Sequence, residues 1–162
     1  MAEINLAVKK LKEKFPACVL EVNLFREEVS VTVEKKEIVE ICKFLYSDQE
    51  LQYQMLTDLC AVDFFPATPR FEVVYLLYSM KSQQRLRLKT RAGESDLCLS
   101  VESIWKAANW LEREVYDLFG IAFENHPDLR RILMWDGYEG HPLRKDFPVE
   151  GPDFDKPFVP EG

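Results

Sequence analysis

The chain has 162 residues, a length that favours one domain with a single hydrophobic core. Its composition, 47% hydrophobic and 30% charged, is that of a soluble globular protein, and no apolar run approaches the roughly 20 residues that a membrane span requires. A formal net charge of −7 repels phosphate backbones, so we do not expect nucleic acid as a partner.

The N-terminal sequence and the cysteines give no sign of secretion or of a metal site. The first fifteen residues hold lysines but no uninterrupted apolar stretch before a cleavage site, so we expect no secretion signal and a cytoplasmic location. The cysteines are widely spaced, form no CxxC pair and have no histidine near them in the sequence. We expect all four on core faces rather than in a zinc or iron-sulfur site: Cys18, Cys42, Cys60 and Cys98.

Helical and strand periodicities alternate in the first third of the chain. Apolar residues recur at helical spacing over residues 4–15, which predicts an amphipathic helix that ends before Pro16. Alternating apolar residues over 18–24 and 29–33, separated by a polar turn, predict a β-hairpin. Helical spacing over 37–46 then predicts a second helix that packs on the sheet.

The next three segments predict strands. Residues 53–65 are rich in aromatic and apolar side chains and end at the breaker sequence at 66–69. Further strands are predicted over 71–80 and 85–91. The last one carries four basic residues on one face, which we expect to be solvated rather than to bind a polyanion, because the chain as a whole is acidic.

A third helix is predicted from Ser100, as its N-cap, to just before Gly120. On this helix Arg113 and Asp117 are four positions apart, a spacing at which they could pair on an exposed face. The element order αββαβββα, with short polar links between strands, favours an α+β fold with a mainly antiparallel sheet and packed helices.

Residues 120–162 differ in composition and form a predicted extended, irregular C-terminal arm after a globular domain at 1–119. The arm holds five of the six glycines, six of the nine prolines and both histidines, without any periodic pattern. Disorder is one interpretation of such a segment, but disordered segments are typically poor in aromatic residues. We therefore expect the arm to lie on a partner, because it carries a ring every few residues: Phe123, Trp135, Tyr138, Phe147, Phe154 and Phe158.

Charged residues of both signs alternate between these rings, a mixture that suits pairing across a protein interface. The basic and acidic members are Arg130, Arg131, Arg144 and Lys145, and Asp128, Asp136, Glu139 and Asp146. The two histidines could form acid–base pairs with Asp128 or Asp146, but no nucleophile stands in a recognisable setting. Because each histidine precedes a proline, a hydrogen bond that fixes a turn is the simpler role.

One continuous motif carries a family resemblance. The sequence ERExxDLFG at 112–120 is followed by HPDLRRIL at 126–133 and GYEGHPLRKDFPVEG at 137–151. These runs, with their spacing, resemble the signature of the 30-kDa subunit, or C subunit, of proton-pumping NADH:quinone oxidoreductase, respiratory complex I. The preceding α+β layout is similar to the globular domain of that family.

The resemblance implies a cofactor-free structural subunit in the peripheral arm of complex I, on the cytoplasmic side of the inner membrane. It implies contact with the D subunit, proximity to the B and I subunits, and membrane association only through the complex. FMN and iron-sulfur clusters lie in partner subunits and pass electrons from NADH to quinone, coupled to proton translocation. The isolated chain is then expected to be non-catalytic.

We expect the arm to dock in extended form on the D subunit, with its cations paired to partner carboxylates, and its root to be held by the third helix. Truncation after Gly120 is then expected to leave the domain folded but abolish assembly. The expected partner-binding residues are Glu112, Arg113, Asp117, His126, Arg130, Arg131, His141, Arg144, Lys145, Asp146 and Phe147.

Two other functions are compatible with the sequence. A homologous subunit of a membrane-bound hydrogenase-type complex would use a similar domain with a different electron donor. A free-standing enzyme would use His126 or His141, and its activity would be detectable in the purified chain.

Overall fold

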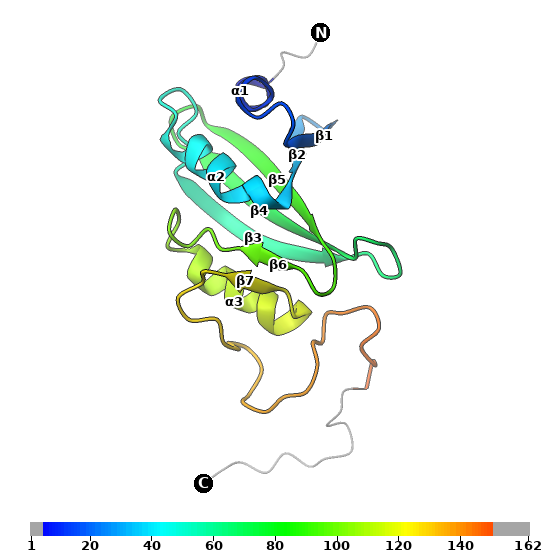
Figure 1. Ribbon diagram of the computed structural model, residues 1–162. Helices are drawn as coiled ribbons and strands as arrows, with labels where there is room; N and C mark the ends of the chain where they lie inside the picture. The colour runs from blue at the N-terminus through cyan, green and yellow to red at the C-terminus, as the bar shows by residue number, and fades with distance from the viewer. Residues whose placement is uncertain (1–4, 151–162) are drawn as a thin grey trace.

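The computed structural model describes residues 5–150 and shows an α+β fold, which confirms the predicted class (Figure 1). Of the predicted aromatic residues of the arm, Phe154 and Phe158 lie outside the described range. The helices are α1 (Leu6–Lys14), α2 (Ile38–Ser47) and α3 (Ala108–Phe119), with a short 3-10 turn, η1 (Lys35–Glu37), before α2. The strands are β1 (Val19–Phe25), β2 (Glu28–Val33), β3 (Met55–Asp63), β4 (Phe71–Ser79), β5 (Gln84–Ala92), β6 (Leu97–Leu99) and β7 (Ala122–Glu124).

Five strands form one sheet in the order β1-β2-β5-β4-β3. The β1–β2, β3–β4 and β4–β5 pairs are antiparallel, as expected for hairpins with short links. The central β2–β5 pair is parallel, with Val31 opposite Leu88. A parallel pair needs a long crossover, and α2, β3 and β4 provide it.

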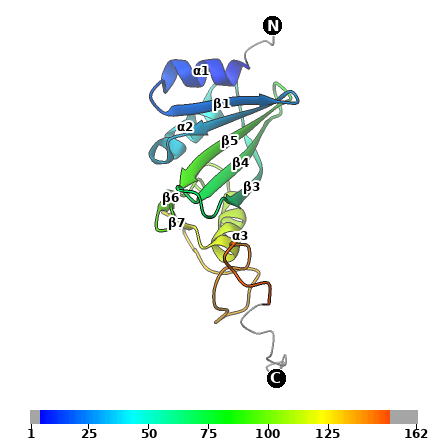
Figure 2. The same cartoon turned by 90° about the vertical axis from the view of Figure 1, so that its right-hand side faces the viewer.

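The core lies between the sheet and the helices that cover one of its faces. Helix α2 lies across that face, α1 lies beside β1 at one end, and α3 packs near β3 at the other end (Figures 1 and 2). Leu11, Ile41 and Leu45 of the helices are fully buried with Tyr75 and Leu88 of the sheet. Their spacing in the sequence is what produced the predicted amphipathic pattern.

The basic residues of β5 lie on the other face of the sheet. Arg87 pairs with Glu28 of β2 at 2.7 Å, and Lys89 pairs with Glu72 of β4 at 2.8 Å. These acidic neighbours compensate much of the positive charge, so the structure gives no reason to favour a polyanion there.

The start of α3 and two short strands differ from the prediction. Helix α3 begins at Ala108, and Ser100 is not its N-cap. Instead, the N–H of Ser100 donates to the carbonyl of Glu124 at 2.9 Å, which continues the pairing of β6 with β7, and its hydroxyl donates to Glu112. These bonds commit Ser100 to the β6–β7 pair and to Glu112, and the helix begins eight residues later. Strands β6 and β7 form a separate two-stranded parallel sheet and were not predicted.

The cysteines are all free, and one of them contradicts the expectation of four core positions. Cys42 and Cys98 are buried and Cys18 is half-buried, but Cys60 of β3 is exposed because alternate residues of a sheet strand point to opposite faces. Within residues 5–150, no group of three or more His, Cys, Asp or Glu side chains is placed to hold a metal ion. No helix in the same range has the length and apolar character needed to cross a bilayer.

Candidate partner-docking site: the C-terminal arm and its root on α3

The described part of the arm, residues 120–150, begins with β7 and then continues without helix or strand. It folds back in a loop beyond α3, at the end of the molecule far from α1 (Figures 1 and 2). Its backbone is shaped by turns, such as the bonds from Arg144 N–H to the His141 carbonyl and from Phe147 N–H to the Arg144 carbonyl, both 3.1 Å. Such turns are local, so the position of the arm depends on contacts with the domain.

Asp117 of α3 is the first anchor of the arm. Its side chain is fully buried, and one carboxylate oxygen, Oδ2, accepts the N–H groups of Ile132 (3.0 Å), Leu133 (2.7 Å) and Met134 (2.8 Å). The other oxygen, Oδ1, accepts from Nη1 of Arg131 at 2.7 Å. Burial alone would raise the pKa of Asp117, but these hydrogen bonds hold it below its ordinary value. The buried charge is therefore stabilised by the arm itself.

Arg113 holds the same arm segment through its carbonyl groups. Its Nε donates to the carbonyl of Arg130 at 3.1 Å and its Nη2 to the carbonyl of Arg131 at 3.0 Å. The alternative that Arg113 and Asp117 pair on an exposed face is wrong, because both side chains are buried beneath the arm. The two residues are four positions apart and lie on one face of the helix, so they bind consecutive peptide groups of the arm. Arg113 donates to carbonyl groups, and Asp117 accepts from N–H groups.

Glu112 supports the start of α3 rather than the arm directly. Its carboxylate is fully buried, accepts the hydroxyl of Ser100 at 2.6 Å and accepts the N–H of Val101 at 2.8 Å. Burial raises the pKa of Glu112 to about 7, although both hydrogen bonds act in the opposite direction. The Nε2 of His126 lies 3.9 Å from Oε2 of Glu112, and it donates to the carbonyl of Asn109 at 3.0 Å.

The C-terminal end of α3 is capped by the arm. Gly120 has a φ of +75°, the left-handed conformation that ends many helices. Its missing side chain makes room for two arm residues, since a Cβ there would lie 2.5 Å from both Nη2 of Arg144 and Nε2 of His141. Nδ1 of His141 donates to the Asp117 carbonyl at 2.9 Å, and Nε of Arg144 donates to the Phe119 carbonyl at 2.6 Å.

These contacts satisfy carbonyls that a helix end leaves without partners, and they place cationic or donor groups at its negative end. The carbonyl of Leu118, which lies between the two just described, accepts the N–H of Leu143 at 3.0 Å. Burial, together with the nearby charges of Arg144 and Arg131, lowers the pKa of His141 despite its bond to the Asp117 carbonyl. The motif DLFG thus supplies an anchor, a helix end and a gap for the returning arm.

The middle of the arm closes on itself through aromatic rings. Trp135 and Tyr138 make an edge contact with ring centroids 4.7 Å apart, and Tyr138 lies 6.3 Å from Phe147. Arg131 stacks over Tyr138 at 5.8 Å and donates through Nη2 to the carbonyl of Gly140 at 2.9 Å. Phe147 thus packs within the chain, close to Gly140, where a Cβ would lie 2.7 Å from its ring.

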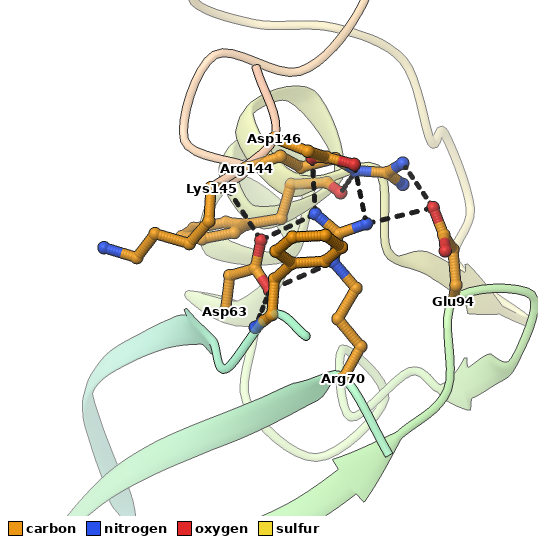
Figure 3. Close-up of polar contacts among 8 residues, drawn as sticks. Asp63, Arg70, Glu94, Arg144, Lys145 and Asp146 are labelled. Atoms are coloured by element: carbon orange, nitrogen blue, oxygen red, sulfur yellow. Dashed lines mark hydrogen bonds and ion pairs between the residues drawn. The ribbon is translucent and has the colours of Figure 1, made fainter. Parts of the chain in front are cut away.

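A second anchor lies at the end of the β3–β4 hairpin, where Arg70 binds carboxylates from three segments (Figure 3). Its Nε and Nη2 donate to the two oxygens of Asp63 at 3.0 and 2.8 Å. Its Nη1 donates to Asp146 of the arm at 3.0 Å and to Glu94 of the β5–β6 connection at 3.1 Å. Arg144 also reaches Glu94, at 3.2 Å. The arm is therefore tied to the hairpin as well as to α3.

The charges of this second anchor stabilise one another. The bonds from Arg70 lower the pKa of Asp63 to about 2, although burial opposes the shift, and the same arginine lowers the pKa of Asp146. The bonds to Asp63 and Asp146 raise the pKa of Arg70 in turn. Asp63 also accepts the N–H groups of Phe65 (2.9 Å) and Lys145 (2.8 Å), so both of its oxygens are used fully.

Several arm side chains point away from these anchors. Leu133 and Trp135 are each 56% exposed, and Leu143 is 49% exposed. Arg130 pairs only with the neighbouring Asp128 among the described residues, and both side chains are well exposed. The side chain of Lys145 extends away from the second anchor (Figure 3). The outward surface of the arm thus combines apolar side chains with charges of both signs, since Asp136, Glu139 and Glu150 are exposed as well.

The structure brings most of the expected site residues together, but in contacts within the chain. Glu112 is bonded to Ser100, and His126 is bonded to the carbonyl of Asn109 near the start of α3. The other members that make such contacts bind the arm, the end of α3 or the second anchor: Arg113, Asp117, Arg131, His141, Arg144, Asp146 and Phe147. Of the expected residues, Arg130 and Lys145 present their charges outward. Asp63, Arg70 and Glu94 were missed, because no pattern in the sequence connects the β3–β4 hairpin or the β5–β6 connection to an arm segment fifty or more residues later.

Comparisons with known proteins agree with this architecture. Residues 31–153 match the sequence model of the family described as respiratory-chain NADH dehydrogenase, 30 Kd subunit. A protein of Geobacter sulfurreducens, named as the C subunit of NADH-quinone oxidoreductase, is 56% identical over 155 residues, which cover 94% of each chain. A protein of the same name from Geobacter metallireducens is 57% identical over 154 residues, again covering 94% of each chain.

Two solved structures share the fold. A chain described as the trypsin-resistant fragment of Nqo5 superposes with a TM-score of 0.63 at 28% identity, covering 76% of this chain and all of that one. A chain of the membrane-bound sulfane sulfur reductase, an archaeal respiratory membrane complex, superposes with a TM-score of 0.74 at 27% identity, covering 88% of this chain and 84% of that one.

Proposed function

The chain belongs to the 30-kDa subunit family of the respiratory-chain NADH dehydrogenase, and we propose that its role there is structural, with the arm as its docking surface. It is a subunit of NADH:quinone oxidoreductase, and its partners are other subunits of that complex. One observation carries the structural role. Buried charged side chains of α3 and of the β3–β4 hairpin bind the irregular arm and hold it in place. The arm in this position exposes Leu133, Trp135 and Leu143.

In this proposal the chain contacts the D subunit, with the B and I subunits nearby, on the cytoplasmic side of the membrane. The outward apolar side chains fit the buried centre of an interface, while Arg130 and Lys145 fit partner carboxylates. The chain would reach the membrane only through the complex, because its own contribution is the contact with those subunits.

We propose further that the chain carries no cofactor and that electrons pass through FMN and iron-sulfur clusters of partner subunits. The cysteines support this, since Cys42 and Cys98 are buried with pKa values that burial raises, to about 11 for Cys98, and thiolate is the form that ligates metals. The histidines support it as well, because each uses a ring nitrogen on a main-chain carbonyl. The isolated chain should therefore have neither NADH oxidase nor hydrolase activity.

The hydrogenase-type alternative is less well supported. The likeness to the sulfane sulfur reductase chain indicates that this fold occurs in more than one kind of respiratory complex. However, relatives above 50% identity along nearly the whole chain carry the NADH-quinone oxidoreductase name.

The proposal is tested by purifying the tagged chain from its own membranes and identifying the subunits that accompany it. We expect flavin and iron-sulfur subunits together with NADH:quinone activity, and the D subunit as the chief cross-linked partner. Recovery of nickel-iron hydrogenase subunits, or of the chain alone, would contradict the proposal.

A further inference from the structure

The second anchor of the arm is a latch made by Asp63, Arg70 and Asp146. Arg70 is buried, and its guanidinium lies 5.0 Å from each of the rings of Phe65 and Phe71. The two carboxylates approach it from different segments, Asp63 from the end of β3 and Asp146 from the arm (Figure 3). A single buried cation therefore joins a hairpin end to a segment that has no secondary structure of its own.

The latch brings two exposed surfaces together. Asp63 accepts the N–H of Phe65 through one oxygen and the N–H of Lys145 through the other, so the two backbones lie on either side of one carboxylate. On the hairpin side, Phe64 and Phe65 are each 50% exposed. On the arm side, Leu143 is similarly exposed and Lys145 extends outward.

A partly exposed phenylalanine gives up hydrophobic stabilisation that burial would supply, and here two adjacent ones lie on the hairpin segment that Asp63 joins to the arm. The arm also loses conformational entropy already in the free chain, because the latch forms without any partner. A segment ordered before binding loses less conformational entropy when it binds.

We propose that Arg70 is a positioning residue for partner docking, which acts through Asp63 and Asp146 to present Phe64, Phe65 and Leu143 as one apolar surface with Lys145. This inference rests on the proposed function of the arm and extends its docking surface to the β3–β4 hairpin. The partner that fits is another subunit of the same complex, with an apolar patch and a carboxylate that faces Lys145.

The first test measures the latch in the full chain without partners. Asp146→Asn removes one charge from the arm side and leaves the Arg70–Asp63 pair in place. We expect trypsin to cleave after Arg144 and Lys145 roughly fivefold faster than in the wild type, with the thermal midpoint of the domain nearly unchanged. Glu28→Gln is the matched control, since it also removes a carboxylate charge that pairs with an arginine, in this case Arg87 on the sheet. Equal cleavage of Asp146→Asn and the control would overturn the latch.

The second test measures assembly of the complex with the full-length variants. Asp146→Asn should lower the yield of the chain in purified complex, while complexes that do form keep the wild-type KM for quinone. Restoring the carboxylate with Asp146→Glu should recover much of the yield, which a general loss of stability would not do. Normal yield for Asp146→Asn despite faster cleavage would overturn the positioning role.

A separate variant distinguishes this inference from the proposed function beneath it. Leu133→Asp with Trp135→Asp changes the outward face of the arm and leaves Asp63, Arg70 and Asp146 in place; trypsin cleavage at the wild-type rate after Arg144 and Lys145 verifies that the latch still forms. If this double variant fails to assemble while Asp146→Asn assembles normally, the arm docks but the latch does not position it. If both assemble normally, the docking role of the arm is itself wrong.

Discussion

At the scale of single residues, helix α3 places three ionisable side chains, Glu112, Arg113 and Asp117, in the interior of the protein. Asp117 and Arg113 are compensated by peptide groups and by Arg131 of the arm, so their charges are retained. Glu112 has only a hydroxyl and one peptide N–H, and burial raises its pKa. These neighbours on one helix therefore respond differently to pH.

The raised pKa of Glu112 predicts a loss of stability as the pH rises. The pKa of Glu112 is near 4.5 in the unfolded chain and about 7 in the folded chain. Its contribution to the free energy of unfolding is therefore fully present below about pH 4.5 and is lost as the pH rises through about 7. We expect the free energy of unfolding to fall by roughly 2–3 kcal/mol between about pH 5 and 8. Chemical denaturation at a series of pH values measures this change.

Glu112→Gln is the matched variant, because glutamine keeps the shape and can bond to both Ser100 and Val101. The variant should lack this fall over the same pH range, and the lowered pKa of His141 contributes a change of the opposite sign to both proteins. Asp63 does not interfere, since its folded pKa of about 2 means that its contribution is lost only as the pH falls below about 4. Parallel profiles for the wild type and Glu112→Gln would exclude Glu112 as the source.

The sequence located the residues that act at the arm but not what they bind. In the structure Arg113 and Asp117 hold the root of the arm, and the cations Arg131 and Arg144, which were expected to pair with partner carboxylates, bind within the chain. Helical spacing cannot reveal that Arg113 and Asp117 are buried, because charged helix residues usually lie in solvent.

At the scale of secondary structure, the long elements were predictable and the short ones were not. Periodicity located α1, α2 and the five strands of the main sheet, each at least six residues long. Strands β6 and β7 have three residues each, too few for an alternating pattern to be legible. Because β7 belongs to residues 122–124, the start of the arm also completes a small sheet of the domain.

Truncation after Gly120 is therefore expected to unfold the domain, contrary to the expectation from sequence alone. It removes β7, every peptide partner of Asp117 and the caps of the last α3 carbonyls. Leaving a buried charge without partners costs about 3–5 kcal/mol, a large part of the stability of a typical domain. Circular dichroism during denaturation measures the loss.

A truncation after Glu150 serves as the control, because it keeps all of these contacts and should unfold like the wild type. If the chain that ends at Gly120 unfolds at the wild-type midpoint, the arm contributes nothing to the domain. The result also decides how docking can be studied. Point variants on the outward face are informative, whereas a shortened chain would lose fold and docking together.

At the scale of the whole molecule, the α+β class followed from element order, but the parallel β2–β5 pair and the returning arm did not. Both depend on contacts between segments far apart in the chain, such as Arg70 with Asp146. The arm was expected to lie extended on a partner, and residues 120–150 instead form a loop against their own domain. A preformed arm that still exposes apolar side chains remains suited to docking.

The measurement that tests this account most directly is the yield of complex formed by the full-length double variant Leu133→Asp with Trp135→Asp. Both side chains are more than half exposed, so the isolated chain should remain folded. Leu24→Asp, at a comparably exposed position on β1, is the control. We predict that the control co-purifies with the other NADH:quinone oxidoreductase subunits and that the folded double variant does not. Equal recovery of the complex with both variants would contradict docking through the arm.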